Sequence, residues 1–234
     1  MSDTRDDPAL QVYNAFVTRM NEIIGANFSP EVPNETKRSA GLDDQAGLIV
    51  GAITDKNALR DLRVAMSGLP NAWSVYNWSH VHCTFGAYED LDVTGITDKL
   101  DQDFDRLKQS VQRFVNSNAF TELMLVDLEL RVSADTLILS AKPNRSTFEA
   151  RQGLLAAADT DYQKIRAGGW GSHLTLARLK RPLSPNERTA TNNWIREVRV
   201  LRTVRVTEFL VGAFTVHDER FAFSPAHCTT FPIG

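Results

Sequence analysis

The sequence repeats one order of predicted elements: a strand, a helix, a strand that carries a His-x-Thr motif, a second helix and a third strand. The first copy has its motif at His82–Thr84 and the second at His173–Thr175. A duplicated order of this kind predicts an α+β protein with two β-sheet lobes related by a pseudo-twofold axis. We expect helices to flank the lobes and the two motif strands to meet at a central cleft.

The elements of the two copies follow from hydrophobic periodicity and from capping signals. We predict strands over 47–54, 78–88, 122–132, 135–142, 172–179, 203–215 and 220–232. We predict helices over 8–24, from Asp55 to about Leu69, across Leu100–Phe114, over 146–166 and from Ser184 to about Val198. Asp7 followed by Pro8 and Ser184 followed by Pro185 each fit an N-cap with proline at the first helical position.

One bilobal domain is predicted to span residues 47–234, because no flexible linker separates the two copies. Residues 1–46 form a predicted helix and loop to which the sequence assigns no role. A hydrophobic content of 42% is sufficient for a substantial core. We expect a monomer.

Charge and composition exclude several classes of protein. A net charge of −3 argues against a protein that coats nucleic acid or binds an anionic membrane without specificity. The polar, acidic start has no signal-peptide pattern, and no apolar run reaches about 18 residues, so we expect a cytoplasmic protein without membrane contact. Cys83 and Cys228 do not make a disulfide framework.

Each motif places an imidazole and a hydroxyl on one face of its strand, because side chains two positions apart in a strand point the same way. Histidine exchanges protons near neutral pH, since its reference pKa is about 6.5. Threonine hydroxyls can donate hydrogen bonds to phosphate oxygens. Two facing pairs therefore predict cleavage of a phosphodiester without a metal, with one histidine as base and the other as acid. The sequence does not decide which of His82 and His173 is the acid.

The residues around both motifs resemble the 2H phosphoesterase superfamily, in particular its branch of 2′–5′ RNA ligases and cyclic phosphodiesterases. The segment 171–178, Gly-Ser-His-Leu-Thr-Leu-Ala-Arg, is similar to the second motif of that superfamily. The segment 82–86, His-Cys-Thr-Phe-Gly, is similar to the first, with Cys83 and Phe85 where aliphatic residues are more usual.

The resemblance extends in element order from about residue 47 onward. It implies a bilobal α+β fold, a metal-independent mechanism without a cofactor, and a nucleotide or RNA-end substrate with a 2′,3′-cyclic phosphate or a 2′–5′ linkage. By position it makes His82 and His173 the acid–base pair, and Thr84 and Thr175 the donors to the phosphate. Ligation would be the reverse of the same chemistry.

Four more residues are predicted to contact the substrate. Arg178 follows the second motif and is expected on the face of Thr175, where its guanidinium could bind the phosphate. Trp170 follows a pair of glycines and could stack on a base or pack in the core. Tyr88 and His80 flank the first motif, Tyr88 with the same two alternatives and His80 as a residue that orients its neighbour or lies at the mouth of the cleft.

Two other functions remain open from the sequence. A catalytically inactive nucleotide- or RNA-binding module on the same fold would bind without turnover, although both motifs are intact. A metal-dependent hydrolase would use His80 and His82, which we expect on one strand face, as half of a metal site. Cys83 should point to the opposite face of its strand, and we expect a buried small side chain there rather than a nucleophile.

Overall fold

The computed structural model describes residues 7–38, 45–89, 98–158, 172–217 and 220–233, and within them the predicted α+β class is confirmed. The helices are α1 (Pro8–Asn27), α2 (Arg60–Ala65, followed by a 3₁₀ turn over Met66–Gly68), α3 (Asp98–Ser117), α4 (Arg145–Ala158) and α5 (Pro185–Glu197). The strands are β1 (Gln45–Thr54), β2 (Trp73–Val75), β3 (Cys83–Glu89), β4 (Met124–Val132), β5 (Thr136–Pro143), β6 (His173–Leu179), β7 (Thr203–His217) and β8 (Arg220–Pro232).

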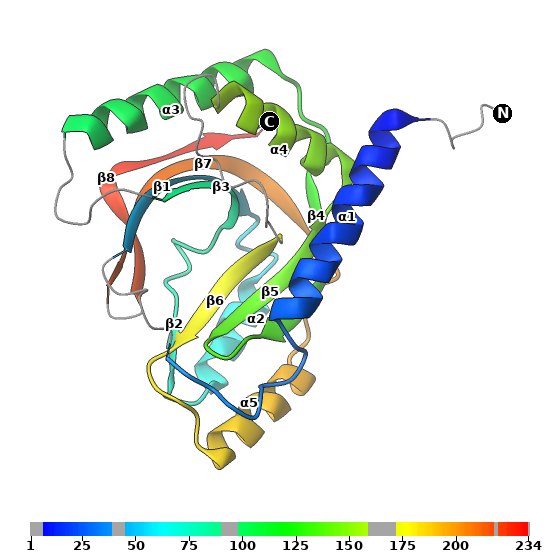
Figure 1. Ribbon diagram of the computed structural model, residues 1–234, viewed down its shortest axis with the longest axis vertical. Helices are drawn as coiled ribbons and strands as arrows, with labels where there is room; N and C mark the ends of the chain where they lie inside the picture. Colours follow the sequence, from blue (N-terminus) through cyan, green and yellow to red (C-terminus); the bar gives the residue numbers. More distant parts are fainter. Residues whose placement is uncertain (1–6, 39–44, 90–97, 159–171, 218–219, 234) are drawn as a thin grey trace.

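The strands form one antiparallel sheet in the order β1-β3-β6-β5-β4-β7-β8, with β2 on β6. Because β7 also pairs with β1, six of the strands close into a ring (Figure 1). Neighbouring strands share few paired residues at two places in the ring. β3 and β6 share the single pair Cys83↔Leu174, and β4 and β7 pair only over Met124–Val126. These two thin joints divide the sheet into the two predicted lobes.

The two copies of the predicted order are both present, as β1-α2-β3-α3-β4 and β5-α4-β6-α5-β7. The last strand of each copy pairs with the first strand of the other, β4 with β5 and β7 with β1. This exchange obeys the pseudo-twofold relation, and it means that neither half of the chain builds a lobe alone.

α3 and α4 lie at one end of the ring and α2 and α5 at the other, while α1 runs along its side (Figure 1). One hydrophobic core runs through both lobes. α3 packs against α4 and against β7 and β8. α5 is tied to α2 by Trp194, whose indole N–H donates to the carbonyl of Ala65 at 2.8 Å. None of the described helices combines the length and the apolar character that crossing a bilayer requires.

The strand predicted over 78–88 begins later, at Cys83. The residues before it form turns, one of which is closed by a hydrogen bond of 2.8 Å from the His80 N–H to the carbonyl of Asn77. His82 therefore stands directly before the strand and His80 is not part of it. The expectation that the two histidines share a strand face is wrong for this reason.

Other boundaries also differ from the pattern. The helix predicted from Asp55 begins at Arg60, because the Asp55 carboxylate accepts hydrogen bonds from two backbone N–H groups in a turn. The described part of the helix predicted over 146–166 ends at Ala158. The short strand β2 was not predicted.

The N-terminal segment, for which the sequence indicates no role, packs along β4 and β5 (Figure 1). Asp7 caps α1 as predicted, and Tyr13 and Phe16 stand against Phe148 of α4 with ring centroids 5.7 and 4.6 Å apart. Beyond α1, Ser29 bridges to the end of β4. The N-terminal segment therefore packs as part of the lobe that contains β4 and β5.

Candidate functional site

The two His-x-Thr motifs lie side by side, because the middle residue of one pairs with the middle residue of the other. Cys83 and Leu174 are antiparallel partners, and both are 0% exposed. Continuation of this register sets each histidine opposite the threonine of the other motif. A local twofold axis through the Cys83–Leu174 pair thus exchanges the motifs, and both histidines and both threonines are partly exposed.

His82 is fixed at both ring nitrogens. Its Nδ1 lies 2.6 Å from the carbonyl oxygen of His80, and its Nε2 lies 3.1 Å from the hydroxyl of Thr84. A carbonyl only accepts, so Nδ1 carries the proton and Nε2 of the neutral ring accepts from the threonine. The backbone at His80, rather than its side chain, therefore orients His82.

Burial lowers the pKa of His82 to about 4. The hydrogen bond to the His80 carbonyl raises this pKa, and the charge of His173 lowers it again. The electrostatic effect of one histidine on the other agrees with the pairing of Cys83 with Leu174, the residues that follow His82 and His173. His82 is therefore neutral at pH 7, with the lone pair of Nε2 directed at Thr84.

Two phenylalanines of β8 cover one side of the His82 imidazole, while the residue as a whole stays partly exposed. The rings of Phe221 and Phe223 each lie 5.1 Å from the imidazole. Gly212 of β7 makes room for this packing, since a Cβ built there would lie 2.6 Å from the Phe223 ring. The Phe-Ala-Phe alternation indicates that both rings share one strand face, but no sequence signal places this last strand over the first motif.

A glycine of β1 also positions the first motif. A Cβ on Gly51 would lie 2.8 Å from the carbonyl oxygen of Cys83 and 3.6 Å from the imidazole of His82. Gly51 pairs with Thr84, next to an irregularity in the β1–β3 ladder. The close approach of β1 thus holds the motif backbone in place.

The second motif has different neighbours. His173 pairs with Ser140 of β5, and its ring lies 6.0 Å from that of Phe28, the residue that follows α1. The Ser140 hydroxyl donates to the carbonyl of Glu129 at 3.0 Å. Sequence reasoning missed Phe28, because only tertiary packing brings the N-terminal segment to this strand.

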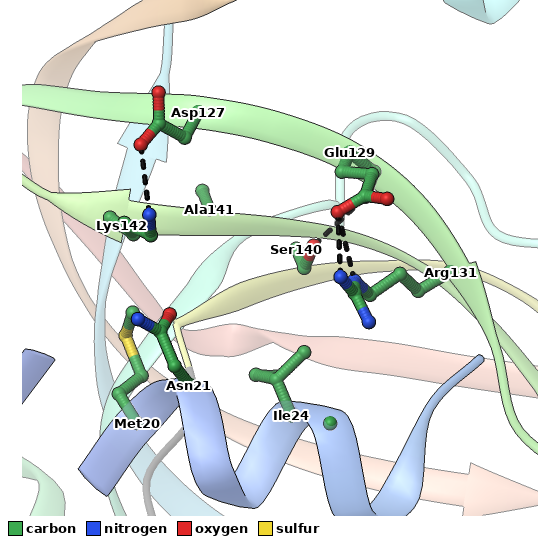
Figure 2. Close-up of a pocket in the computed structure, with 10 residues that line it drawn as sticks. Met20, Asn21, Ile24, Asp127, Glu129, Arg131, Ser140, Ala141 and Lys142 are labelled. Carbon is green, nitrogen blue, oxygen red and sulfur yellow. Dashed lines mark hydrogen bonds and ion pairs between the residues drawn. The ribbon is translucent and has the colours of Figure 1, made fainter. Parts of the chain in front are cut away.

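A groove of about 320 Å³, here called the α1 groove, adjoins the second motif at Ser140 (Figure 2). α1 forms one wall and the charged faces of β4 and β5 form the other. Lys142 binds Asp127 at 3.0 Å, and Arg131 binds Glu129 at 2.8 Å. The cations of this groove are therefore paired with carboxylates.

A bulge in β6 sets the strand face of Arg178. Arg178 lies three positions after Thr175, and in a regular strand residues three positions apart point to opposite faces. A regular strand would therefore not have placed Arg178 on the predicted face. The register leaves Leu176 without a partner on β5, and this extra residue returns Arg178 to the face of Thr175. Its Nε donates to the hydroxyl of Tyr76 at 2.8 Å, and the Tyr76 ring is stacked on Phe221 at 5.8 Å.

The other predicted contacts have separate outcomes. The ring of His80 packs edge-on against Phe223 at 5.7 Å, and its buried Nδ1 has no hydrogen-bond partner among the described residues. Tyr88 belongs to β3 and pairs with Leu48, but its side chain lies outside what the structure describes. Trp170 lies outside the described residues. In the described part of the chain, no group of three or more His, Cys, Asp or Glu side chains could hold a metal ion.

The thiol of Cys83 faces the core, as predicted. Its sulfur lies 3.5 Å from the hydroxyl of Ser172, and burial raises its pKa to about 11. It is therefore protonated at neutral pH and is no nucleophile.

A separate polar group, here called the β8 cluster, consists of Ser224 and His227 in an irregular part of β8 and Asp101 of α3. His227 contacts the Ser224 hydroxyl through Nδ1 at 3.2 Å and the Asp101 carboxylate of α3 through Nε2 at 2.6 Å. Its ring also stands edge-on to Phe104 at 5.3 Å. These contacts join α3 to β8.

Comparison with known proteins identifies the fold. The sequence matches no family model and no curated protein. The crystal structure of TT0787 of Thermus thermophilus matches with a TM-score of 0.55 and 13% identity, over 80% of this chain and 97% of that chain. A structure of E. coli LigT complexed with ATP matches with a TM-score of 0.47 and 12% identity, over 80% and 99% of the two chains. At these identities the likeness is one of fold alone.

Proposed function

We propose that the protein is a metal-independent phosphodiesterase that hydrolyses 2′,3′-cyclic phosphates or 2′–5′ linkages in nucleotides or at RNA ends. The observation that carries the proposal is the antiparallel register of the two motifs, which gathers two histidines and two threonines on one surface. Those groups are sufficient for an in-line displacement at phosphorus, in which one histidine takes a proton from the nucleophile and the other gives a proton to the leaving oxygen.

In this mechanism His82 is the base and His173 is the acid. His82 is neutral at pH 7 and has its unprotonated Nε2 on the side of Thr84. It takes a proton from the attacking water while the new P–O bond forms. His173 gives a proton to the ribose oxygen as its P–O bond breaks, and both histidines then return to their starting states by exchange with solvent.

The threonines stabilise the charge on the phosphate. When substrate binds, the Thr84 hydroxyl turns from Nε2 of His82 to a non-bridging oxygen, which leaves Nε2 free to accept from water. Thr84 and Thr175 then donate to the non-bridging oxygens, on which negative charge builds up in the transition state. Arg178 adds a positive charge on the same face, held in place by its hydrogen bond to Tyr76.

The experiment is turnover with EDTA present of 2′,3′-cyclic AMP, 2′–5′-linked triadenylate and a 3′–5′ cyclic dinucleotide. His82→Ala and His173→Ala should each lower kcat/KM by about 10²–10⁴-fold, while His227→Ala, which removes a histidine of the separate β8 cluster, should retain turnover. Loss of activity in EDTA would favour the metal-dependent alternative. Binding without turnover by the folded wild type would favour a nucleotide-binding module.

A further inference from the structure

A second hollow, here called the side pocket, opens beside the first motif. It has a volume of about 550 Å³ and lies between β2, the end of β6 and the start of β8. Its walls include Tyr76, His80, Lys180, Arg220 and Phe221. A volume of this size is within the range of pockets that hold small ligands, roughly 300–1,000 Å³.

The side pocket and the two-histidine site share walls. Phe221 lines the pocket and also lies 5.1 Å from the imidazole of His82. Tyr76, which lines the pocket as well, accepts the hydrogen bond of Arg178. A molecule whose phosphate lies between the histidines could therefore extend over Phe221 into the pocket without leaving the surface.

The side pocket offers positive charge to a ligand. Lys180 and Arg220 come from different elements and are both exposed. Within the described ranges neither side chain has a carboxylate or hydrogen-bond partner, and the side pocket has no acidic residue among those that line it. Two exposed cations at one opening, without a carboxylate partner among the described residues, favour an anionic group such as a phosphate.

The same pocket offers apolar surface to a base. Val75 is 41% exposed, one of few large apolar side chains at the surface of the described chain, and Phe221 is partly exposed beside it. Bases pack on aromatic and apolar side chains in single-stranded nucleic acid sites. Apolar surface beside two cations matches a nucleotide unit, with its base and its phosphate.

We propose that the side pocket binds the nucleotide adjoining the one that carries the scissile phosphate, with its base on Phe221 and Val75 and its phosphate between Lys180 and Arg220. This inference rests on the proposed function and specifies its substrate class: the protein prefers an oligonucleotide end to a free cyclic mononucleotide.

The test compares two substrates, 2′,3′-cyclic AMP and a trinucleotide that ends in a 2′,3′-cyclic phosphate. In the double variant Lys180→Ala/Arg220→Ala, kcat/KM should fall about tenfold for the trinucleotide and less than about twofold for the mononucleotide. The steeper salt dependence of trinucleotide cleavage should also be lost in the variant. The matched control, Arg63→Ala/Arg199→Ala, removes two exposed arginines outside the pocket and should leave both substrates unchanged.

Equal effects of the double variant on the two substrates, or none, would overturn the side-pocket proposal. If the wild type cleaves neither substrate, the proposed function fails, and a binding measurement then decides the pocket separately. The probe is a trinucleotide with a terminal 3′-phosphate, and calorimetry measures its affinity for the wild type and for the double variant. Weaker binding by the double variant supports the pocket, and unchanged binding overturns it.

Discussion

The two motifs are related by a twofold axis, but their surroundings are not. The first motif packs under Phe221 and Phe223 and adjoins a pocket in which Lys180 and Arg220 have no carboxylate partner within the described ranges. The second touches Phe28 and adjoins a groove in which Lys142 and Arg131 are paired with carboxylates (Figure 2). The comparison teaches that duplication supplies a pair of like groups, while packing on each copy gives them different burial and different neighbouring charges.

The largest expected effect tests the burial of His82. Phe221→Ala should let water reach the imidazole and raise its pKa from about 4 toward its ordinary value of 6.5. The proposed base accepts a proton only in its neutral form. His82 with a pKa of about 4 stays neutral down to low pH, whereas a variant with a higher pKa is protonated and inactive at the same low pH. At pH 5 the neutral fraction would fall by up to about 30-fold, so the acid limb of kcat/KM should move upward.

The matched change at the other motif is Phe28→Ala, which should leave the acid limb near pH 4. The pH profiles of wild type and both variants, with activity at pH 8 as the check on folding, distinguish the two sides. Equal shifts in both variants would contradict the assignment of His82 as the base.

A somewhat smaller effect is expected from Gly51→Ala. The added Cβ would press on the Cys83 carbonyl, and overpacking of this kind destabilises by about 1–3 kcal/mol. In a chain of this size that lowers the Tm by about 2–12 °C, and the shift of the motif backbone should lower kcat as well. Thermal unfolding and turnover measure the two consequences.

Gly25→Ala is the control for that substitution. Gly25 lies in α1 beside the α1 groove, and a Cβ there meets nothing within 4 Å. Alanine is the better helix former by about 0.5–1 kcal/mol, so this variant should unfold at a slightly higher temperature with unchanged kcat. A loss of activity in Gly25→Ala equal to that in Gly51→Ala would show that neither effect is specific to the motif.

The paired cations of the α1 groove should matter little. Lys142→Ala removes one member of an exposed ion pair, and such pairs contribute about 0–1 kcal/mol. Its kcat/KM for the trinucleotide and its salt dependence should stay within about twofold of wild type. A tenfold loss would mean that the substrate lies along α1 instead of in the side pocket.

The smallest effect is expected at the cluster on β8. Asp101→Asn weakens the contact between α3 and His227 without touching either motif. We expect unchanged turnover and a Tm lowered by no more than a few degrees. Reduced hydrolysis of any substrate would give Ser224, His227 and Asp101 a chemical part that their structural contacts do not require.

The order of the elements and the location of both motifs could be predicted, because periodicity and caps are local signals. Asp7 and Ser184 cap helices where expected, the latter with a full capping box. The first motif strand was predicted too long, since alternation alone did not reveal the turn closed between Asn77 and His80. The bulge at Leu176 was equally hidden, because it is defined by pairing with β5.

The surroundings of the motifs could not be predicted, because they arise from contacts between distant parts of the chain. Phe28 meets His173 and Phe221 meets His82 only after the sheet has closed. The charges that line the α1 groove and the side pocket could not be predicted either, for the same reason. Lys142 and Lys180 look alike in a sequence, and only the structure shows that Asp127 stands against one of them.

Closure of the ring through β1 and β7 has a consequence for synthesis of the chain. Gln45 pairs with Val216, so the long first strand has one unpaired edge until most of the chain has been made. Pairings of such high sequence separation form slowly, and an open strand edge invites association with other chains. The nascent protein should therefore pass through an aggregation-prone stage that ends when β7 emerges, and a product truncated before that strand should be insoluble even though both histidines are present.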